Sequence, residues 1–221
     1  MNQWIFSICN FSFKQTLSIF SDIKISGKEN IPLNGPVIIV SNHISNIDPA
    51  IVAASITRRP NFLAKKELFN NFFLNNFLRS YGAYPVDRGK GDIGALRWGE
   101  KQLKKGNALI LFPEGTRSKS GKLMKGKSGV VKLAAITGSP IIPMGISGSE
   151  NLQNLLKVLV PISKLRIKIG SSFFVKKENF LNKNDYEEAT KEIMIKIAMQ
   201  LPNKYHGDYQ VDENLKFSYI N

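Results

Sequence analysis

Residues 35–50 have the sequence GPVIIVSNHISNIDPA, in which a mostly apolar run is followed by a polar loop and then by Asp48 and Pro49. The run at 37–41 shows no alternation of apolar and polar positions, which is typical of a central strand that is covered on both faces. A helix should begin at Pro49, because proline suits the first helical position and aspartate the position before it. The stretch therefore predicts a strand, a loop and a helix of an α/β fold.

Short β-branched runs alternate with amphipathic stretches through the rest of the chain, which is typical of strand–helix–strand units. We predict further strands at 61–64, 83–86, 108–112, 141–146 and 165–169, and helices at 67–79, 92–105, 128–137 and 186–201. The pattern indicates an α/β fold, a single domain at 25–221 with a mostly parallel central sheet flanked by helices. Residues 1–24 form an N-terminal amphipathic segment outside it.

The composition limits the possible functions. The 221 residues are 43% hydrophobic, which excludes a disordered or fibrous protein. One cysteine and two histidines exclude a disulfide scaffold and argue against a metal site with several histidine or cysteine ligands. The 31 basic and 17 acidic residues give a net charge of +14. We therefore expect an anionic partner, which composition leaves open as nucleic acid, an anionic membrane or a phosphorylated small molecule.

The first 21 residues, projected as a helix, place their polar side chains in one narrow stripe within a wide apolar arc. The stripe consists of Gln3, Ser7, Asn10, Lys14, Ser18 and Ser21. With no acidic residue before Asp22, this pattern favours a helix that lies in a membrane interface, and the alternative is a helix packed on the protein's own core. No apolar run is long enough to span a bilayer and no signal peptide is recognisable, so we expect the protein to stay in the cytosol.

Four unusual polar segments follow predicted strands, where α/β proteins place functional residues: SNHISNIDPA, YPVDRG, LFPEGTRS and IIPMG. In the first, His43 and Asp48 are five positions apart and can meet only across a turn. Asp48 would then accept the imidazole N–H and leave the other nitrogen free as a base. The alternatives are that Asp48 caps the following helix, which its second oxygen would allow at the same time, and that His43 is a satisfied buried histidine.

Basic residues gather at three of the predicted strand ends. LFPEGTRS carries Arg117 after a glycine turn, YPVDRG carries Arg88, and Lys65 follows the strand at 61–64. An arginine on such a turn suits bidentate binding of phosphate, so these residues predict an anion pocket. The alternative is a solvated loop in which Glu114 pairs with Arg117.

These four segments, in this order, resemble those of the lysophosphatidate acyltransferase family, the glycerolipid acyltransferases with a histidine, four residues and an aspartate. The matching stretches are 43–48, 81–88, 112–118 and 141–145, and the AKKEL segment at 64–68 is also similar to the family. The resemblance covers about residues 25–200 and rests mainly on FPEGTRS lying at the right distance after His43.

The resemblance implies transfer of a fatty acyl group from a thioester, acyl-CoA or acyl-carrier protein, to the sn-2 hydroxyl of 1-acyl-sn-glycerol-3-phosphate. His43 would act as general base and Asp48 would orient it. The substrate phosphate would be held by Arg88, Arg117 and Lys65, whereas Glu114, Gly115 and Thr116 would position the glycerol or shape the turn. No metal or further cofactor is implied.

We expect the protein to bind an anionic membrane surface, as a peripheral or monotopic protein at the cytoplasmic face of the cell membrane. Two alternatives stay open. The acceptor could be glycerol-3-phosphate or another lysolipid, or the chain could be a non-catalytic basic protein that binds membrane or nucleic acid. No nucleic-acid reading motif is recognisable, so we expect no nucleic-acid partner.

Overall fold

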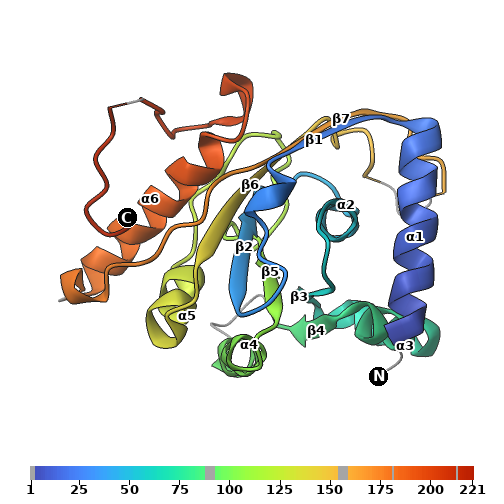
Figure 1. The fold of residues 1–221 in the computed structure, drawn as a ribbon, viewed down its shortest axis with the longest axis horizontal. Helices are drawn as coiled ribbons and strands as arrows, with labels where there is room; N and C mark the ends of the chain where they lie inside the picture. The colour runs from blue at the N-terminus through green and yellow to red at the C-terminus, as the bar shows by residue number, and fades with distance from the viewer. Residues whose placement is uncertain (1–2, 88–92, 154–158, 181, 213) are drawn as a thin grey trace.

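A seven-stranded sheet forms the centre of the molecule in a computed structural model, which describes residues 3–87, 93–153, 159–180, 182–212 and 214–221 (Figure 1). The strands are β1 Asp22–Ser26, β2 Val37–Ser41, β3 Pro60–Lys65, β4 Ala83–Val86, β5 Ala108–Leu111, β6 Ile141–Ser147 and β7 Lys164–Ile169. Their order in the sheet is β1-β7-β6-β2-β5-β3-β4, and all neighbouring strands are parallel except β6 and β7. The predicted α/β class with a mostly parallel sheet is confirmed.

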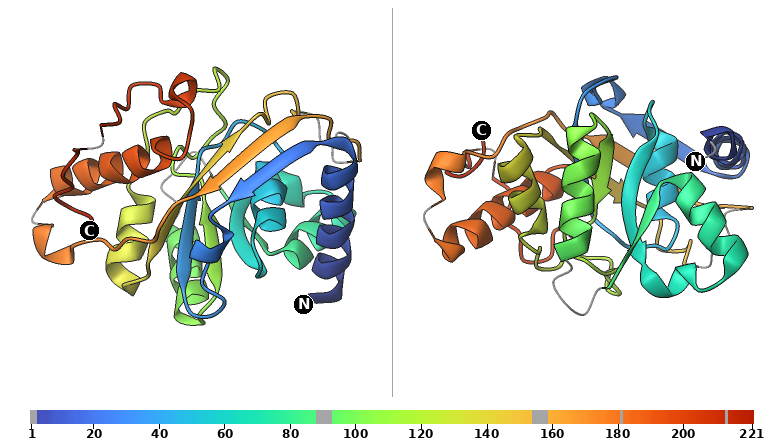
Figure 2. Two further views of the ribbon diagram at one scale, coloured as in Figure 1. Left: turned by 45° about the horizontal axis from the view of Figure 1, so that its top comes forward. Right: turned by 90° about the horizontal axis from the view of Figure 1, so that it is seen from below.

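Helices cover both faces of this sheet (Figure 2). They are α1 Gln3–Phe20, α2 Asp48–Ser55, α3 Phe72–Tyr81, α4 Ile93–Lys104, α5 Gly129–Thr137 and α6 Lys183–Ala198. Side chains of α1, α2 and α3 belong to the core cluster on one face, and side chains of α4, α5 and α6 belong to the cluster on the other. Because both core clusters pack against the same sheet, the described residues form one domain.

The burial of the central strand β2 on both faces explains why apolar and polar residues do not alternate in its sequence. Val37 and Ile39 pack into one core cluster, whereas Ile38 and Val40 pack into the other, and all four are fully buried. Burying one such side chain contributes about 1.5–3 kcal/mol, so both faces of the strand require apolar residues. The prediction of a central strand at 37–41 is therefore confirmed.

Two predicted helices begin at different residues in the structure, because side-chain caps decide where they start. The helix predicted at 67–79 is instead a short 3₁₀ turn, Lys66–Phe69, followed by α3, where Asn71 accepts a hydrogen bond from the Leu74 N–H at 3.1 Å. The helix predicted from 186 begins three residues earlier. Asn182 and Asp185 form a reciprocal capping box at its start.

The segment after α1 forms β1, a strand that the sequence pattern did not predict. It pairs in parallel with β7, and the Asp22 carboxylate lies 2.6 Å from the Arg166 guanidinium. The predicted boundary between the N-terminal segment and the domain lies inside this strand, between residues 24 and 25. The edge of the sheet is thus built by the residues that directly follow α1.

Helix α1 has one face in the core and one face exposed. Phe6, Phe13 and Leu17 are buried in the core cluster, and Asn10 is buried where it accepts a hydrogen bond from the Tyr81 hydroxyl at 3.2 Å. The exposed large apolar side chains are Trp4, Ile8, Phe11, Ile19 and Phe20, and all but Phe20 are more than half exposed. The wide apolar arc is therefore divided between the core and the surface. None of the described helices is long and apolar enough to cross a membrane.

Candidate active site

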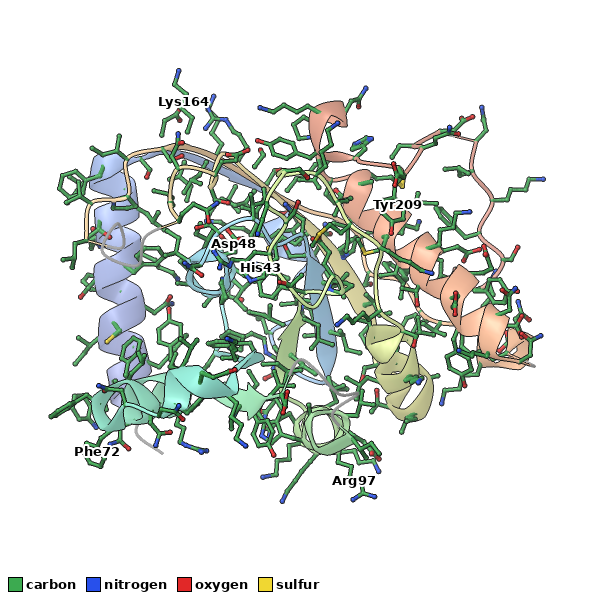
Figure 3. The ribbon with its side chains drawn as sticks, turned by 180° about the vertical axis from the view of Figure 1, so that it is seen from behind. His43, Asp48, Phe72, Arg97, Lys164 and Tyr209 are labelled. Atoms are coloured by element: carbon green, nitrogen blue, oxygen red, sulfur yellow. The ribbon has the colours of Figure 1, made fainter. Side chains whose placement is uncertain are left out.

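His43 and Asp48 lie together at the carboxyl end of β2, in the centre of the molecule (Figure 3). The His43 Nδ1 atom is 2.9 Å from Asp48 Oδ2, and both side chains are buried. A carboxylate at this distance is an acceptor, so Nδ1 carries the proton and donates it. No residue that the structure describes forms a hydrogen bond with Nε2, which leaves that nitrogen able to accept a proton.

Asp48 holds the loop that precedes it and does not cap the helix that follows. Its Oδ2 atom also accepts hydrogen bonds from the backbone N–H groups of Ile44 and Ser45, both at 2.6 Å. Asp48 is itself the first residue of α2, and Ile47 occupies the N-cap position without a side-chain cap. The prediction of a helix N-cap at Asp48 is wrong, because the loop curls so that its amides point back at the carboxylate. The result is a fixed turn that sets the position of His43.

The segment after β5 contacts His43 in three ways. The His43 N–H donates to Glu114 Oε1 at 3.0 Å, and the His43 carbonyl accepts from the Ser118 N–H at 2.8 Å. The imidazole ring stacks on Phe112 with centroids 4.3 Å apart. Glu114 Oε2 accepts from the Met124 N–H at 3.1 Å, so both carboxylate oxygens bind backbone. Of the two expected roles of Glu114, these contacts favour shaping the loop over contacting glycerol.

Asn42 attaches the same loop to β6, a contact that the sequence did not predict. Its side-chain amide donates to the Ile146 carbonyl and accepts from the Ile146 N–H, both at 2.8 Å. Ser45 Oγ donates to the Leu152 carbonyl, and Asn46 donates to the Gln153 carbonyl. The loop that carries His43 is thus fixed by β5 on one side and by β6 and the segment after it on the other.

Arg117 lies at the exposed rim beside this loop. Its Nη1 donates to Gln153 Oε1 at 3.2 Å, and Gln153 Nε2 donates to the Ile44 carbonyl at 3.1 Å. The alternative ion pair with Glu114 does not form, since Glu114 is buried and engaged with backbone. Gln153 therefore connects the guanidinium to the carbonyl of Ile44, the residue after His43, and the exposed side of Arg117 can contact an anion.

Lys127 is a further cation at this loop, and its position was not predicted from the sequence. Gly115 has a φ of 71°, and a Cβ atom on it would lie 3.0 Å from both Cε and Nζ of Lys127. The lysine side chain therefore lies over the glycine turn, and Gly115 precedes Arg117 by two residues in the chain. The signal was the run of lysines at 119, 122, 125 and 127, directly after FPEGTRS.

The other predicted phosphate ligands lie farther along the sheet edge or outside the described residues. Lys65 ends β3, two strands from β2, so it lies about 10 Å away across the sheet. It forms an ion pair with Glu67 at 3.3 Å, and both side chains are more than half exposed. Thr116 is exposed, and Arg88 lies outside the described residues. The described residues contain no group of three His, Cys, Asp or Glu side chains that could bind a metal.

Glu114 should make the stability of the fold depend on pH. Burial raises the pKa of Glu114 to about 7, against the opposing effect of its two backbone hydrogen bonds. Between its ordinary value of 4.5 and about 7, the native state therefore holds a proton that the unfolded chain releases. Relative to Glu114→Gln, wild-type stability should be highest below this window and fall by about 3 kcal/mol as the pH rises through it. Urea melts of both proteins at several pH values measure this, and a constant difference would contradict the buried acid.

The family model described as Acyltransferase matches residues 22–147, more than half of the chain, and the chain belongs to this acyltransferase family. The 1-acyl-sn-glycerol-3-phosphate acyltransferase of Bacillus subtilis is 29% identical over 167 residues, 75% of this chain and 81% of that protein. The enzyme of the same name from Saccharomyces cerevisiae is 32% identical over 177 residues, 73% of this chain and 58% of that protein.

A solved structure agrees with this assignment. The crystal structure of the 1-acyl-sn-glycerophosphate acyltransferase PlsC from Thermotoga maritima matches with a TM-score of 0.66 and 28% sequence identity. The match covers 85% of this chain and 76% of that one. The chain spans only about half the length of some other curated relatives, such as 52% of the enzyme from Borreliella burgdorferi.

Proposed function

We propose that this acyltransferase transfers a fatty acyl group from an acyl thioester to the sn-2 hydroxyl of 1-acyl-sn-glycerol-3-phosphate, making phosphatidic acid. The observation that carries the proposal is the pairing of His43 Nδ1 with Asp48 at 2.9 Å, which leaves Nε2 free at the end of β2. The names of the relatives support this acceptor, and acyl-CoA and acyl-carrier protein are both possible donors.

In the proposed reaction, Nε2 of His43 takes the proton of the acceptor hydroxyl as its oxygen attacks the thioester carbonyl. The Asp48 carboxylate stabilises the imidazolium that forms. The tetrahedral intermediate then expels the thiolate, which takes the proton from His43, so the histidine ends as it began. Cys9 lies in α1 and packs against the core cluster there, which supports direct transfer without an acyl-enzyme.

The acceptor phosphate would bind Arg117 and Lys127 at the rim, with Lys65 assisting from β3. Arg117 belongs to the segment 112–118 that contacts His43, and Lys127 lies over Gly115 of the same segment, so a phosphate bound there would place the glycerol hydroxyls near the base. An equimolar mixture of lysophosphatidate, glycerol-3-phosphate and monoacylglycerol tests the acceptor. We expect lysophosphatidate to be consumed first, whereas preferential use of glycerol-3-phosphate would indicate the alternative acceptor.

Arg117→Lys should raise the KM for lysophosphatidate roughly tenfold or more, because lysine keeps the charge but cannot reproduce the planar, two-pronged contact. The KM for the donor should change less. Arg97→Lys is the matched control, since Arg97 is exposed on α4 (Figure 3). An unchanged acceptor KM for Arg117→Lys, measured by steady-state kinetics, would show that the phosphate binds elsewhere.

We also propose that the protein binds an anionic membrane at the cytoplasmic face of the cell membrane, where the acyl chain of the acceptor lies. Helices α1 and α3 and the segment before β7 lie at the same end of the molecule (Figure 1), and each carries exposed apolar side chains. They include Trp4, Ile8, Phe11, Phe72, Phe73, Leu159 and Ile162. The hydroxyl of Ser21, directly after α1, donates a hydrogen bond to the Pro161 carbonyl, which connects the end of α1 to the segment before β7. The net charge of +14 favours an anionic surface.

Replacing Trp4 and Phe11 together by serine should lower vesicle affinity at least tenfold, since burying each aromatic contributes about 1.5–3 kcal/mol in the ideal case. Point changes are a sharper test than deleting residues 1–21, because Phe13 and Leu17 belong to the core. Ile136→Ser on α5 is the matched control, since Ile136 is also an exposed apolar residue. Equal sedimentation of all three proteins with vesicles would contradict this membrane face.

A further inference from the structure

A cavity of about 270 Å³ lies between α1, β1 and α2, apart from the candidate active site. It is lined by Lys14, Leu17, Ser18, Ile23, Ile25, Lys28 and Ala54. Ala54 is near the end of α2, whereas Asp48 begins that helix, so about 9 Å of helix separates the cavity from the catalytic pair. The volume is several times the roughly 30 Å³ that one water molecule occupies in the liquid.

The cavity holds two lysines that repel each other and lack an acidic partner. Burial lowers the pKa of Lys14, and the charge of Lys28 lowers it further. Neither ammonium group forms an ion pair or a hydrogen bond with any other part of the chain that the structure describes. An anion between them would remove the repulsion and satisfy their N–H donors.

The walls of the cavity combine polar and apolar groups. Its lining is more polar than apolar: Lys14, Lys28 and Ser18 supply polar groups, whereas Leu17, Ile23 and Ile25 supply an apolar part. Phe11, on the exposed apolar face, lies three positions before Lys14 and therefore on the neighbouring turn of α1. A ligand that joins an anionic group to an apolar body, at the border of a membrane-binding face, fits both features.

We infer that this cavity binds the phosphate headgroup of an anionic membrane phospholipid, with Lys14 and Lys28 contacting the phosphate and Ser18 donating a hydrogen bond. The inference rests on the proposed membrane binding by α1. The site is separate from the one that holds the substrate phosphate, so a bound lipid would keep α1 on the bilayer while the acceptor enters and the product leaves.

The test measures the affinity of the full chain for phosphatidylcholine vesicles that contain phosphatidate. Lys14→Gln and Lys28→Gln should each weaken binding roughly fivefold. Lys24→Gln is the matched control, because Lys24 is exposed on β1 between Ile23 and Ile25 and so faces away from the cavity. It should weaken binding less than twofold. An equal loss in all three variants would mean general surface charge and would overturn the site.

Two further measurements separate the sources of the phosphate and the two proposals. Soluble sn-glycerol-3-phosphate should change the melting temperature of the wild type and of Lys14→Gln equally; a stabilisation lost in Lys14→Gln would show a free-phosphate site and overturn the lipid assignment. In detergent micelles, Lys14→Gln should acylate lysophosphatidate at the wild-type rate. If the wild-type protein showed no acylation, the proposed function would be refuted. If the wild type were active and Lys14→Gln acylated lysophosphatidate more slowly, Lys14 would take part in the reaction, and the proposal of a separate lipid site would be overturned.

Discussion

His43→Ala is expected to lower the rate of acyl transfer by about 10²–10⁴-fold, the usual loss when a general base is removed. The loop should keep its conformation, because its attachments to Glu114 and Ser118 use the backbone of residue 43 and Asp48 still accepts from two amides. The loss should therefore lie in turnover, with a circular dichroism spectrum like that of the wild type.

The chain provides its own control for this experiment. His206, the other histidine, forms a hydrogen bond between Nε2 and the Leu201 carbonyl at 2.9 Å, after the end of α6. His206→Ala should leave the transfer rate of the folded protein within about twofold of the wild type, because the hydrogen bond of His206 lies after α6 and not in the loop that carries His43. If folded His43→Ala retained near-normal turnover, His43 would not be the base.

Asp48→Asn should lower turnover on the order of 10²–10⁴-fold, although asparagine has the same shape. Its carbonyl oxygen can still accept from the amides of Ile44 and Ser45, so the turn should persist. The lost element is the negative charge beside the imidazolium that forms in the transition state. The effect should therefore appear in kcat more than in KM.

Asp48→Ala separates this electrostatic role from the structural one. It removes the acceptor of two buried backbone amides as well, so we expect a further loss of about 1–3 kcal/mol in the free energy of unfolding. Urea melts of both variants measure that difference. If Asp48→Asn kept the wild-type kcat and Asp48→Ala only lost stability, Asp48 would serve the fold alone.

The parts of the fold that were predictable from sequence depend on local patterns. The strand at 37–41 is buried on both faces, and its first four residues, which pack into the two core clusters, are all apolar. Whether α1 packs on the core or lies in a membrane was not predictable in the same way, because a wide apolar arc fits a core helix and a membrane helix equally well. Asn10 illustrates this, since its burial depends on Tyr81, 71 residues later in the chain.

The same distinction applies to the candidate site. The five-residue spacing of His43 and Asp48 sufficed to predict a pairing across a turn. The role of Glu114 could not be predicted, because its partners are backbone amides of His43 and Met124 that only the fold brings near. Lys127 reaches Gly115 by the same kind of long-range packing, and a lysine-rich loop does not say which lysine will do so.

The most direct test of the central claim is mass spectrometry of the lipids formed by the purified wild-type protein from lysophosphatidate and an acyl thioester, with acyl-CoA and acyl-carrier protein as separate donors. We expect phosphatidic acid, heavier than the acceptor by one acyl group, with at least one donor, and a loss of this product in His43→Ala. Release of free fatty acid from the thioester, with lysophosphatidate left unchanged by the wild type, would contradict it.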